Sequence, residues 1–233
     1  MAFFDTPFFY FILLLITLSY PLLQSFEKRL NYYSNWNRLF KSIFLMMCLF
    51  IPWDIYFTAN GVWGFNEKFI LDIPHFLFLP LEEWLFFIII PYACVFIYEV
   101  LNYFFPLRRN YGIINKILFA KSVTLLILAF VFYSKIYTSL CFSLASLFIY
   151  FLYQLDSKEL FKIYRAYLVS LIPFIIINGF LTGSYTSEPI VWYNDVHNLG
   201  VRFLNIPIED FIYSFLMLSM TLFFFTKQKS ITK

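Results

Sequence analysis

The sequence predicts an all-α, polytopic membrane protein with seven transmembrane helices. Three observations indicate this class: the composition, the number of long apolar stretches and a repeat of motifs between the two ends of the chain. The 233 residues are 61% hydrophobic and 13% charged, whereas soluble domains carry roughly 25% charged residues. Such a composition cannot cover a water-facing surface. It excludes a disordered chain, a secreted disulfide scaffold and a nucleic-acid-binding protein.

The seven apolar stretches each hold about 20 residues, the length that a helix needs to cross the hydrocarbon core. Fourteen of the 17 basic residues fall on one side of a seven-span arrangement, and Lys68, Lys135 and Arg202 fall on the other. Because basic loops stay in the cytoplasm, we expect an outside N-terminus and a cytoplasmic C-terminus, in a multi-pass protein of a bacterial-type cytoplasmic membrane. The predicted spans are 3–26, 40–59, 77–103, 113–133, 136–155, 162–182 and 205–226.

The two outward loops, 60–76 and 183–204, precede the same motif. In each half a tryptophan and an asparagine come before a proline, and two acids stand at the second and third positions after that proline; the prolines lie 127 residues apart. An offset of four spans keeps both copies in one orientation, which predicts a parallel 3+1+3 repeat. Its parts are a first repeat at 1–105, a linker helix at 106–135 and a second repeat at 136–233. The matched residues are Asp54 and Asn178, Asn66 and Asn194, Pro80 and Pro207, and the pairs Glu82-Glu83 and Glu209-Asp210.

The two acidic pairs allow two interpretations. Each pair occupies the first turn of a predicted helix, where carboxylates are stabilised by the helix dipole, so a capping role would explain one such pair. Two pairs in register favour a functional role, because ionisable groups inside a span are costly. Adjacent helical residues point about 100° apart. We therefore expect one acid of each pair to face a shared central cavity near its outer end, and the other to face a helix or loop.

Several motifs resemble those of one family. They are Pro80-Leu81-Glu82-Glu83, Asn178-Gly179-Phe180-Leu181-Thr182-Gly183, Trp192-Tyr193-Asn194, Leu199-Gly200-Val201-Arg202 and Pro207-Ile208-Glu209-Asp210. In order, spacing and duplication they are similar to the integral-membrane lycopene cyclases of the bacterial heterodimeric type, here with both halves in one chain, and to the cyclase domain of the fungal bifunctional enzyme. One departure is Asp72-Ile73-Pro74-His75, which stands in place of a Leu-Gly-x-Arg segment, so Arg202 lacks a counterpart in the first half.

The resemblance implies a lycopene β-cyclase, which closes β-ionone rings at the ends of lycopene without net oxidation. An acid protonates the terminal double bond, a neighbouring double bond attacks the cation, and a base removes a ring proton. Asn66 and Asn194 are expected to hold the acids by hydrogen bonds. The expected catalytic residues are Glu82, Glu83, Glu209 and Asp210, with either acid of a pair as the donor. The expected supporting or pocket residues are Asp54, Asn66, Pro80, Asn178, Asn194, Arg202 and Pro207.

No cofactor is expected, because the six glycines never form the GxGxxG turn of a flavin domain and His75 and His197 stand alone in their loops, without metal-ligand spacing. The expected partner is the carotenoid substrate, lycopene, within the lipid bilayer. The sequence leaves open whether the chain acts alone, as a homo-oligomer or with other carotenoid enzymes. Two alternatives remain: a 3+1+3 small-solute transporter and an inactive carotenoid-binding membrane protein.

Overall fold

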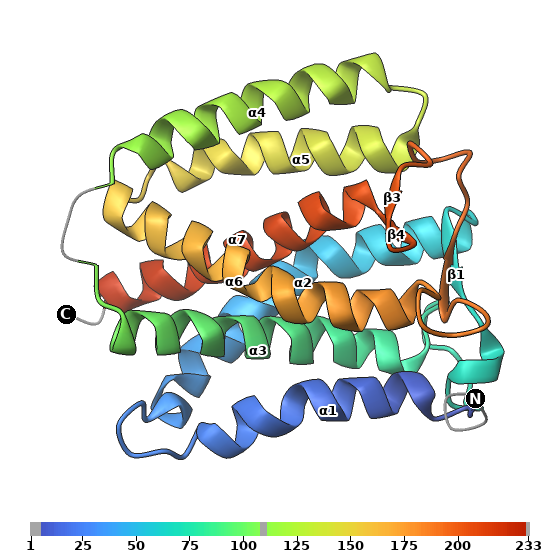
Figure 1. Cartoon of the computed structure of the whole chain (residues 1–233), viewed down its shortest axis with the longest axis horizontal. Coiled ribbons are helices and arrows are strands. Elements are labelled where there is room, and N and C mark those ends of the chain that lie inside the picture. Colours follow the sequence, from blue (N-terminus) through green and yellow to red (C-terminus); the bar gives the residue numbers. More distant parts are fainter. Residues whose placement is uncertain (1–5, 108–110, 232–233) are drawn as a thin grey trace.

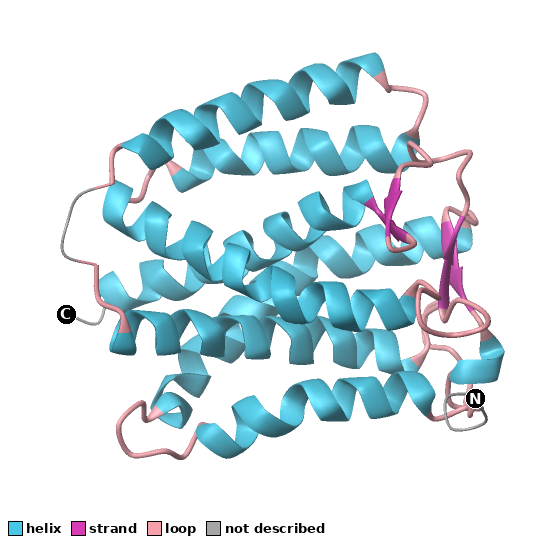
Figure 2. Ribbon diagram, in the orientation of Figure 1, coloured by secondary structure: helices cyan, strands magenta, loops and turns pink. Residues whose placement is uncertain are grey.

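The computed structural model describes residues 6–107 and 111–231, and most of this part of the chain is helical (Figure 1 and Figure 2). The first residues of the predicted span 3–26, and the basic residues Arg108, Arg109 and Lys233, lie outside the described residues. The helices are α1 (Phe9–Gln24), α2 (Trp36–Ala59), α3 (Leu81–Phe104), α4 (Ile113–Val131), α5 (Ile136–Leu152), α6 (Ser157–Leu181) and α7 (Ile208–Ile231), with short 3₁₀ helices η1 (Tyr32–Asn35) and η2 (Glu67–Phe69).

The helices cross the molecule in alternating directions (Figure 1). Helices α1, α3, α5 and α7 run one way, and α2, α4 and α6 run back. Four short strands lie together at one end of the bundle, where α2 and α6 finish and α3 and α7 begin (Figure 2). We call this end the strand end. The strands are β1 (Trp63–Phe65), β2 (Val191–Tyr193), β3 (Arg202–Phe203) and β4 (Ile206–Pro207).

The helices have the length and surface of a membrane protein. Five segments are long and apolar enough to cross a bilayer: Tyr32–Ala59, Leu81–Phe104, Ile113–Val131, Ser157–Leu181 and Ile208–Gln228. Helices α1 and α5 are apolar but shorter, with 16 and 17 residues. Large apolar side chains such as Phe119 and Phe130 of α4 are exposed, which suits contact with lipid. The chain is therefore a helical membrane protein, and the count of seven spans remains a prediction.

Two predicted helix starts, at 77 and 205, were wrong. Helices α3 and α7 begin later, at Leu81 and Ile208, because a tight hairpin turn precedes each of them. The hairpins pair Phe76 with Leu79 and Phe203 with Ile206. Two-residue hairpin turns of this kind need positive φ at both central residues. These residues are Leu77 (53°) and Phe78 (70°) in the first half, and Leu204 (49°) and Asn205 (61°) in the second.

Two other helices begin earlier than predicted. Helix α6 starts at Ser157 rather than 162, because the side chain of Asp156 accepts a hydrogen bond from the backbone N–H of Glu159 and caps the helix. Helix α2 starts at Trp36 rather than 40. In both cases the first turns carry charged or polar residues, which a search for apolar stretches passes over.

The two halves of the chain pack in matching ways. Helix α1 packs against α3 as α5 packs against α7, and α2 packs against α7 as α6 packs against α3. Strands β1 and β2 join the loops 60–76 and 183–204 as an antiparallel pair centred on Gly64 and Trp192. The backbone N–H of Asn66 donates to Ile190 (2.8 Å), and that of Asn194 donates to Val62 (2.9 Å). This pairing brings the starts of α3 and α7 together.

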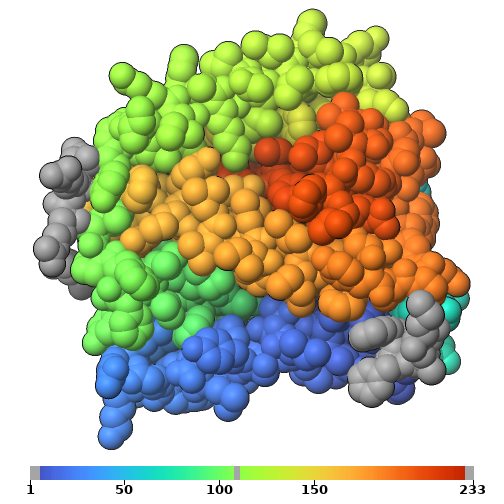
Figure 3. Space-filling model, in the orientation of Figure 1, coloured from blue at the N-terminus to red at the C-terminus, as the bar shows by residue number. Residues whose placement is uncertain are grey.

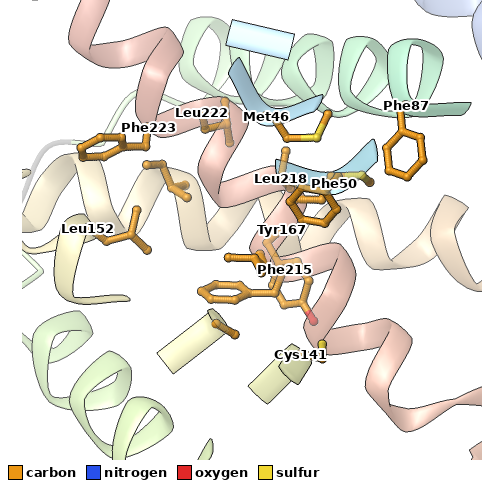
Figure 4. Packing of buried hydrophobic residues seen from close by; sticks show 14 of the residues in the cluster. Met46, Phe50, Phe87, Cys141, Leu152, Tyr167, Phe215, Leu218, Leu222 and Phe223 are labelled. Carbon is orange, nitrogen blue, oxygen red and sulfur yellow. The ribbon is translucent and has the colours of Figure 1, made fainter. Parts of the chain in front are cut away.

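Helix α7 lies at the centre of the bundle. In the most apolar 18-residue stretch of α7, 67% of the residues are buried, against 22% in the corresponding stretch of the peripheral helix α4. The buried side chains Phe215, Leu218 and Leu222 of α7 pack with Met46 and Phe50 of α2 (Figure 4). On the face shown in Figure 3, α6 (orange) lies between α4 above and α1 (blue) below. The central position of α7 places its first turn deep within the strand end.

Candidate active site

A cavity runs from the strand end into the bundle. It is lined by residues of α1, α2, α3, α5, α6, α7 and the strands β1 and β2. Along α3 it extends from Glu83 to Ile97, 14 residues, or about 21 Å at the helical rise of 1.5 Å per residue. Pro91 of α3 and Pro173 of α6 both line it. Most of the lining is apolar, so the cavity suits a long hydrocarbon.

Three carboxyl groups line this cavity: Asp54, Glu83 and Asp210. Glu83 and Asp210 belong to the two predicted acidic pairs, and they come from α3 and α7, one from each half. All three side chains are buried. The structure thus brings together at one cavity an acid from each half of the chain and a third acid from α2.

Phenolic hydroxyl groups hold two of these acids. Tyr10 donates to Glu83 Oε2 at 2.7 Å. Tyr137 donates to Asp210 Oδ1 at 2.6 Å, and Tyr193 donates to Asp210 Oδ2 at 2.9 Å. Hydrogen bonds to a carboxyl group fix the orientation of that group. Each acid is therefore held in place by groups from other elements.

Asp54 has a different partner. Its Oδ1 accepts a hydrogen bond of 2.6 Å from the indole N–H of Trp63. Its Oδ2 has no hydrogen-bond partner among the described residues. Asn178, the residue matched to Asp54 in the second half, also lines the cavity.

Glu82 and Glu209, the other members of the acidic pairs, face away from the cavity lining and hold loops. Glu82 Oε1 accepts a hydrogen bond from the backbone N–H of Leu71 (2.7 Å), and Glu209 Oε1 accepts one from Leu199 (2.9 Å). Thr138 also donates to Glu209 Oε1, at 2.5 Å. Both glutamates are fully buried. The expected division within each pair is therefore seen in the geometry: one acid lines the cavity and the other binds a loop.

The two asparagines lie elsewhere than expected. The amide of Asn66 donates to Glu188 Oε2 (3.1 Å) and to the carbonyl of Pro189, and that of Asn194 donates to the carbonyl of Gly61. Each thus ties the loop of one half to the loop of the other. The expected bonds from these amides to the acids were wrong, because tyrosines occupy those places.

The remaining predicted residues surround the site rather than line it. Arg202, in β3, forms an ion pair with Asp195 and donates to the carbonyl of Asn205 at 2.9 Å. Pro80 stands in extended conformation just before α3, and Pro207 ends β4 just before α7. Both prolines position the acidic first turn that follows them.

Sequence reasoning missed the tyrosines and Trp63. Tyr10 and Tyr137 are two of 18 tyrosines, and nothing local distinguishes them. They lie 127 residues apart, the same spacing as the two prolines. Applying that offset to the first helix of each half would have identified the pair.

Two ionisable groups of the loop 183–204, Tyr193 and Asp195, have shifted pKa values. Burial, followed by the nearby charge of Asp210, raises the pKa of Tyr193 well above its usual value. This phenol therefore keeps its proton and donates a hydrogen bond to the carboxylate. Slight burial raises the pKa of Asp195, but the hydrogen bond and charge of Arg202 outweigh this and leave it below its usual value. Within the described residues no three His, Cys, Asp or Glu side chains are grouped as a metal site.

Comparisons with known proteins agree with this arrangement. The sequence model of the lycopene cyclase family matches residues 7–101 and 134–227, which together make up most of the chain. The two matched segments start 127 residues apart, so the internal repeat fits them. Comparison with curated proteins gives no match, and comparison with solved structures gives none either. The family match supports a role as a lycopene cyclase, an enzyme of carotenoid cyclisation, and the chain belongs to the lycopene cyclase family.

Proposed function

We propose that this chain converts the linear ends of lycopene into β-ionone rings by acid–base catalysis, without net oxidation. One observation carries the proposal: Glu83 and Asp210, one from each half, line the same end of a long and mostly apolar cavity. A carotenoid is a hydrocarbon that resides in the bilayer. Its binding needs apolar walls, and its cyclisation needs carboxyl groups at one point along them.

The proposed reaction balances without a redox partner. A neutral carboxylic acid in the cavity donates its proton to the terminal double bond, which leaves a tertiary cation. A neighbouring double bond attacks that cation and closes the six-membered ring. A carboxylate then removes a ring proton, and the new ring double bond forms. One proton enters and one leaves, so the product is an isomer of the substrate.

Aromatic side chains would stabilise the cation between these steps. Phe65, Phe86 and Tyr213 line the cavity along with the acids. The face of an aromatic ring attracts a desolvated cation by about 2 kcal/mol, and an aromatic ring does not trap it as a nucleophile would. These rings therefore lower the energy of the intermediate while leaving the ring carbon free to lose its proton.

Within each acidic pair the two residues would have different roles. Glu83 and Asp210 act on the substrate, because they line the cavity. Glu82 and Glu209 fix the loops that lead into α3 and α7, through their bonds to the backbone of Leu71 and Leu199. Glu82 and Glu209 are thus structural, and Glu83 and Asp210 are catalytic.

We also propose the membrane arrangement that the basic loops predict. Seven spans would place the strand end outside and the C-terminus in the cytoplasm. The chain would consist of a first repeat at 1–105, a linker helix at 106–135 and a second repeat at 136–233. Lycopene would enter from the lipid between α1 and α6. Thr17 of α1 and Ile177 of α6 both line the cavity, while Phe9 and Phe180 meet edge to face at 5.9 Å closer to the strand end.

Pigment analysis tests the proposal. Cells that accumulate lycopene should form carotenoids with β-rings when they express this chain. A control strain should express the double variant Glu83→Gln, Asp210→Asn at the same membrane level, and its lycopene should stay linear. If the unaltered chain is folded in the membrane and leaves lycopene linear, the proposed function is wrong.

A further inference from the structure

We infer that the two halves of the site have different catalytic roles: Glu83 is the proton donor, Asp210 is the proton acceptor, and Tyr193 is the positioning residue that separates these roles. The inference rests on the proposed function and deepens it. The two halves present their acids on equivalent helices, so a difference in role must come from the residues around each acid. Two such differences are present, and both favour the same assignment.

The first difference is the number of hydrogen bonds. Asp210 accepts two phenolic hydrogen bonds, from Tyr137 and Tyr193, whereas Glu83 accepts one, from Tyr10. Tyr193 comes just before Asn194, and the residue in the same place before the matched Asn66 is Phe65, which has no hydroxyl group. Hydrogen bonds to a carboxylate stabilise its charged form. Asp210 is therefore better suited than Glu83 to remain a carboxylate and accept a proton.

The second difference is a positive charge. The guanidinium group of Arg202 lies 5.8 Å from the centre of the Tyr193 ring, on the side of the site that holds Asp210. The same guanidinium group also pairs with Asp195, whose side chain is half exposed. The position 127 residues earlier is His75, an exposed side chain. The fixed cation thus belongs to the Asp210 side and further favours an anion there.

The assignment predicts where solvent hydrogen enters the carotenoid. In deuterated water Glu83 carries deuterium and adds it to the terminal double bond of lycopene. Without a working base the cation returns a proton to the Glu83 carboxylate, so the substrate is recovered linear but labelled. Without the acid, no deuterium is added at all.

The experiment uses the purified full-length chain in liposomes with lycopene in deuterated water, followed by mass spectrometry. Glu83→Gln should lower both ring formation and deuterium uptake by 10²-fold or more, roughly the low end of a general-acid contribution. Asp210→Asn should lower ring formation by a similar factor while deuterium still accumulates at the terminal double bond of linear lycopene. The ratio of label to rings separates a lost acid from a lost base.

Tyr193→Phe gives the second measurement, because it leaves Asp210 with a single phenolic hydrogen bond, as Glu83 has. Ring formation should fall about tenfold, the effect of one hydrogen bond to a charged group, and labelled linear lycopene should increase. A purely structural role for Tyr193 would lower the amount of folded protein and leave the ratio of label to rings unchanged. That unchanged ratio would remove Tyr193 from the assignment.

The outcomes also distinguish this inference from the proposed function. Labelled linear lycopene with Glu83→Gln but not with Asp210→Asn reverses the roles and overturns the inference, although the chain is still a cyclase. An equal absence of label in both variants overturns it as well. If both variants form rings at the normal rate, the proposed acid–base function itself fails.

Discussion

Tyr10 and Tyr137 lie 127 residues apart and donate matching hydrogen bonds, of 2.7 Å to Glu83 and of 2.6 Å to Asp210. Each tyrosine stands in the first turn of the first helix of its half, and each acid stands in the first turn of the third helix. The way in which a carboxyl group is presented to the cavity is therefore duplicated along with the helices that carry it.

This relationship predicts the effect of removing either hydroxyl group. Tyr10→Phe and Tyr137→Phe should each lower ring formation per folded molecule by at least about tenfold, because a hydrogen bond to a charged group contributes roughly 1.5–3 kcal/mol. For Tyr137 that group is the Asp210 carboxylate, and for Tyr10 it is the carboxylate that forms on Glu83 as its proton leaves. Pigment analysis normalised to folded protein measures this. Tyr32→Phe is the matched control, since Tyr32 is buried and donates to the carbonyl of Tyr92, a bond between buried groups outside the cavity lining. Equal loss in the control would show that packing, rather than the acids, explains the effect.

The strand pair predicts a steric effect at Gly64. A Cβ atom added there would lie 2.4 Å from Cζ2 of Trp192. Gly64→Ala should therefore lower the free energy of unfolding by about 1–3 kcal/mol, the usual cost of overpacking. Thermal unfolding in detergent measures it. Gly112→Ala serves as the control, because no atom lies within 4 Å of its added Cβ.

A second substitution tests the cause of that loss. Shortening the partner in the double variant Gly64→Ala, Trp192→Leu removes the clash and should restore part of the lost stability. If the double variant is as unstable as the sum of its two single changes, the contact with Trp192 does not explain the loss.

The proposed topology predicts which loops react with a reagent that cannot cross the membrane. Lys68→Cys and Glu188→Cys lie at the strand end, where the two native side chains form a half-exposed ion pair at 3.6 Å. In a background without the three native cysteines, both should be labelled in intact cells. Lys158→Cys, on the cytoplasmic side, should be labelled only after the cells are opened. The opposite pattern would invert the chain in the membrane.

The proposed isomerisation predicts that turnover needs no bound flavin or metal. The purified chain should form β-rings after extensive dialysis against a chelator, and its absorption spectrum should lack flavin bands. Electrons are neither gained nor lost between substrate and product, which is the physical reason. A stoichiometric flavin whose removal ends turnover would contradict this expectation.

Much of the fold could be predicted because it depends on hydrophobic length. The apolar stretches predicted the seven helices of the described chain, and the prolines Pro80 and Pro207 revealed the repeat. The starts of α3 and α7 could not be predicted. Leu77 and Phe78 adopt positive φ, a conformation that bulky L-residues rarely take, so their identities give no sign of a turn.

The site was partly predictable for a related reason. Acids in apolar stretches are rare, so Glu82, Glu83, Glu209 and Asp210 stand out. Tyrosines are common in this chain, and those that hold the acids are recognised only when distant segments meet. The bonding of Asn66 and Asn194 depends on the pairing of β1 with β2 across the two halves, which no local pattern announces.

The central claim is that the cavity-facing acids carry out the chemistry while their neighbours hold loops. The most direct test compares β-ring formation per folded molecule between Glu83→Gln and Glu82→Gln, two equal chemical changes one residue apart. Glu83→Gln should lose activity by 10²-fold or more. Glu82→Gln should keep most of its activity, because the glutamine carbonyl can still accept the bond from Leu71. Near-normal activity in Glu83→Gln, or an equal loss in both variants, would contradict the account.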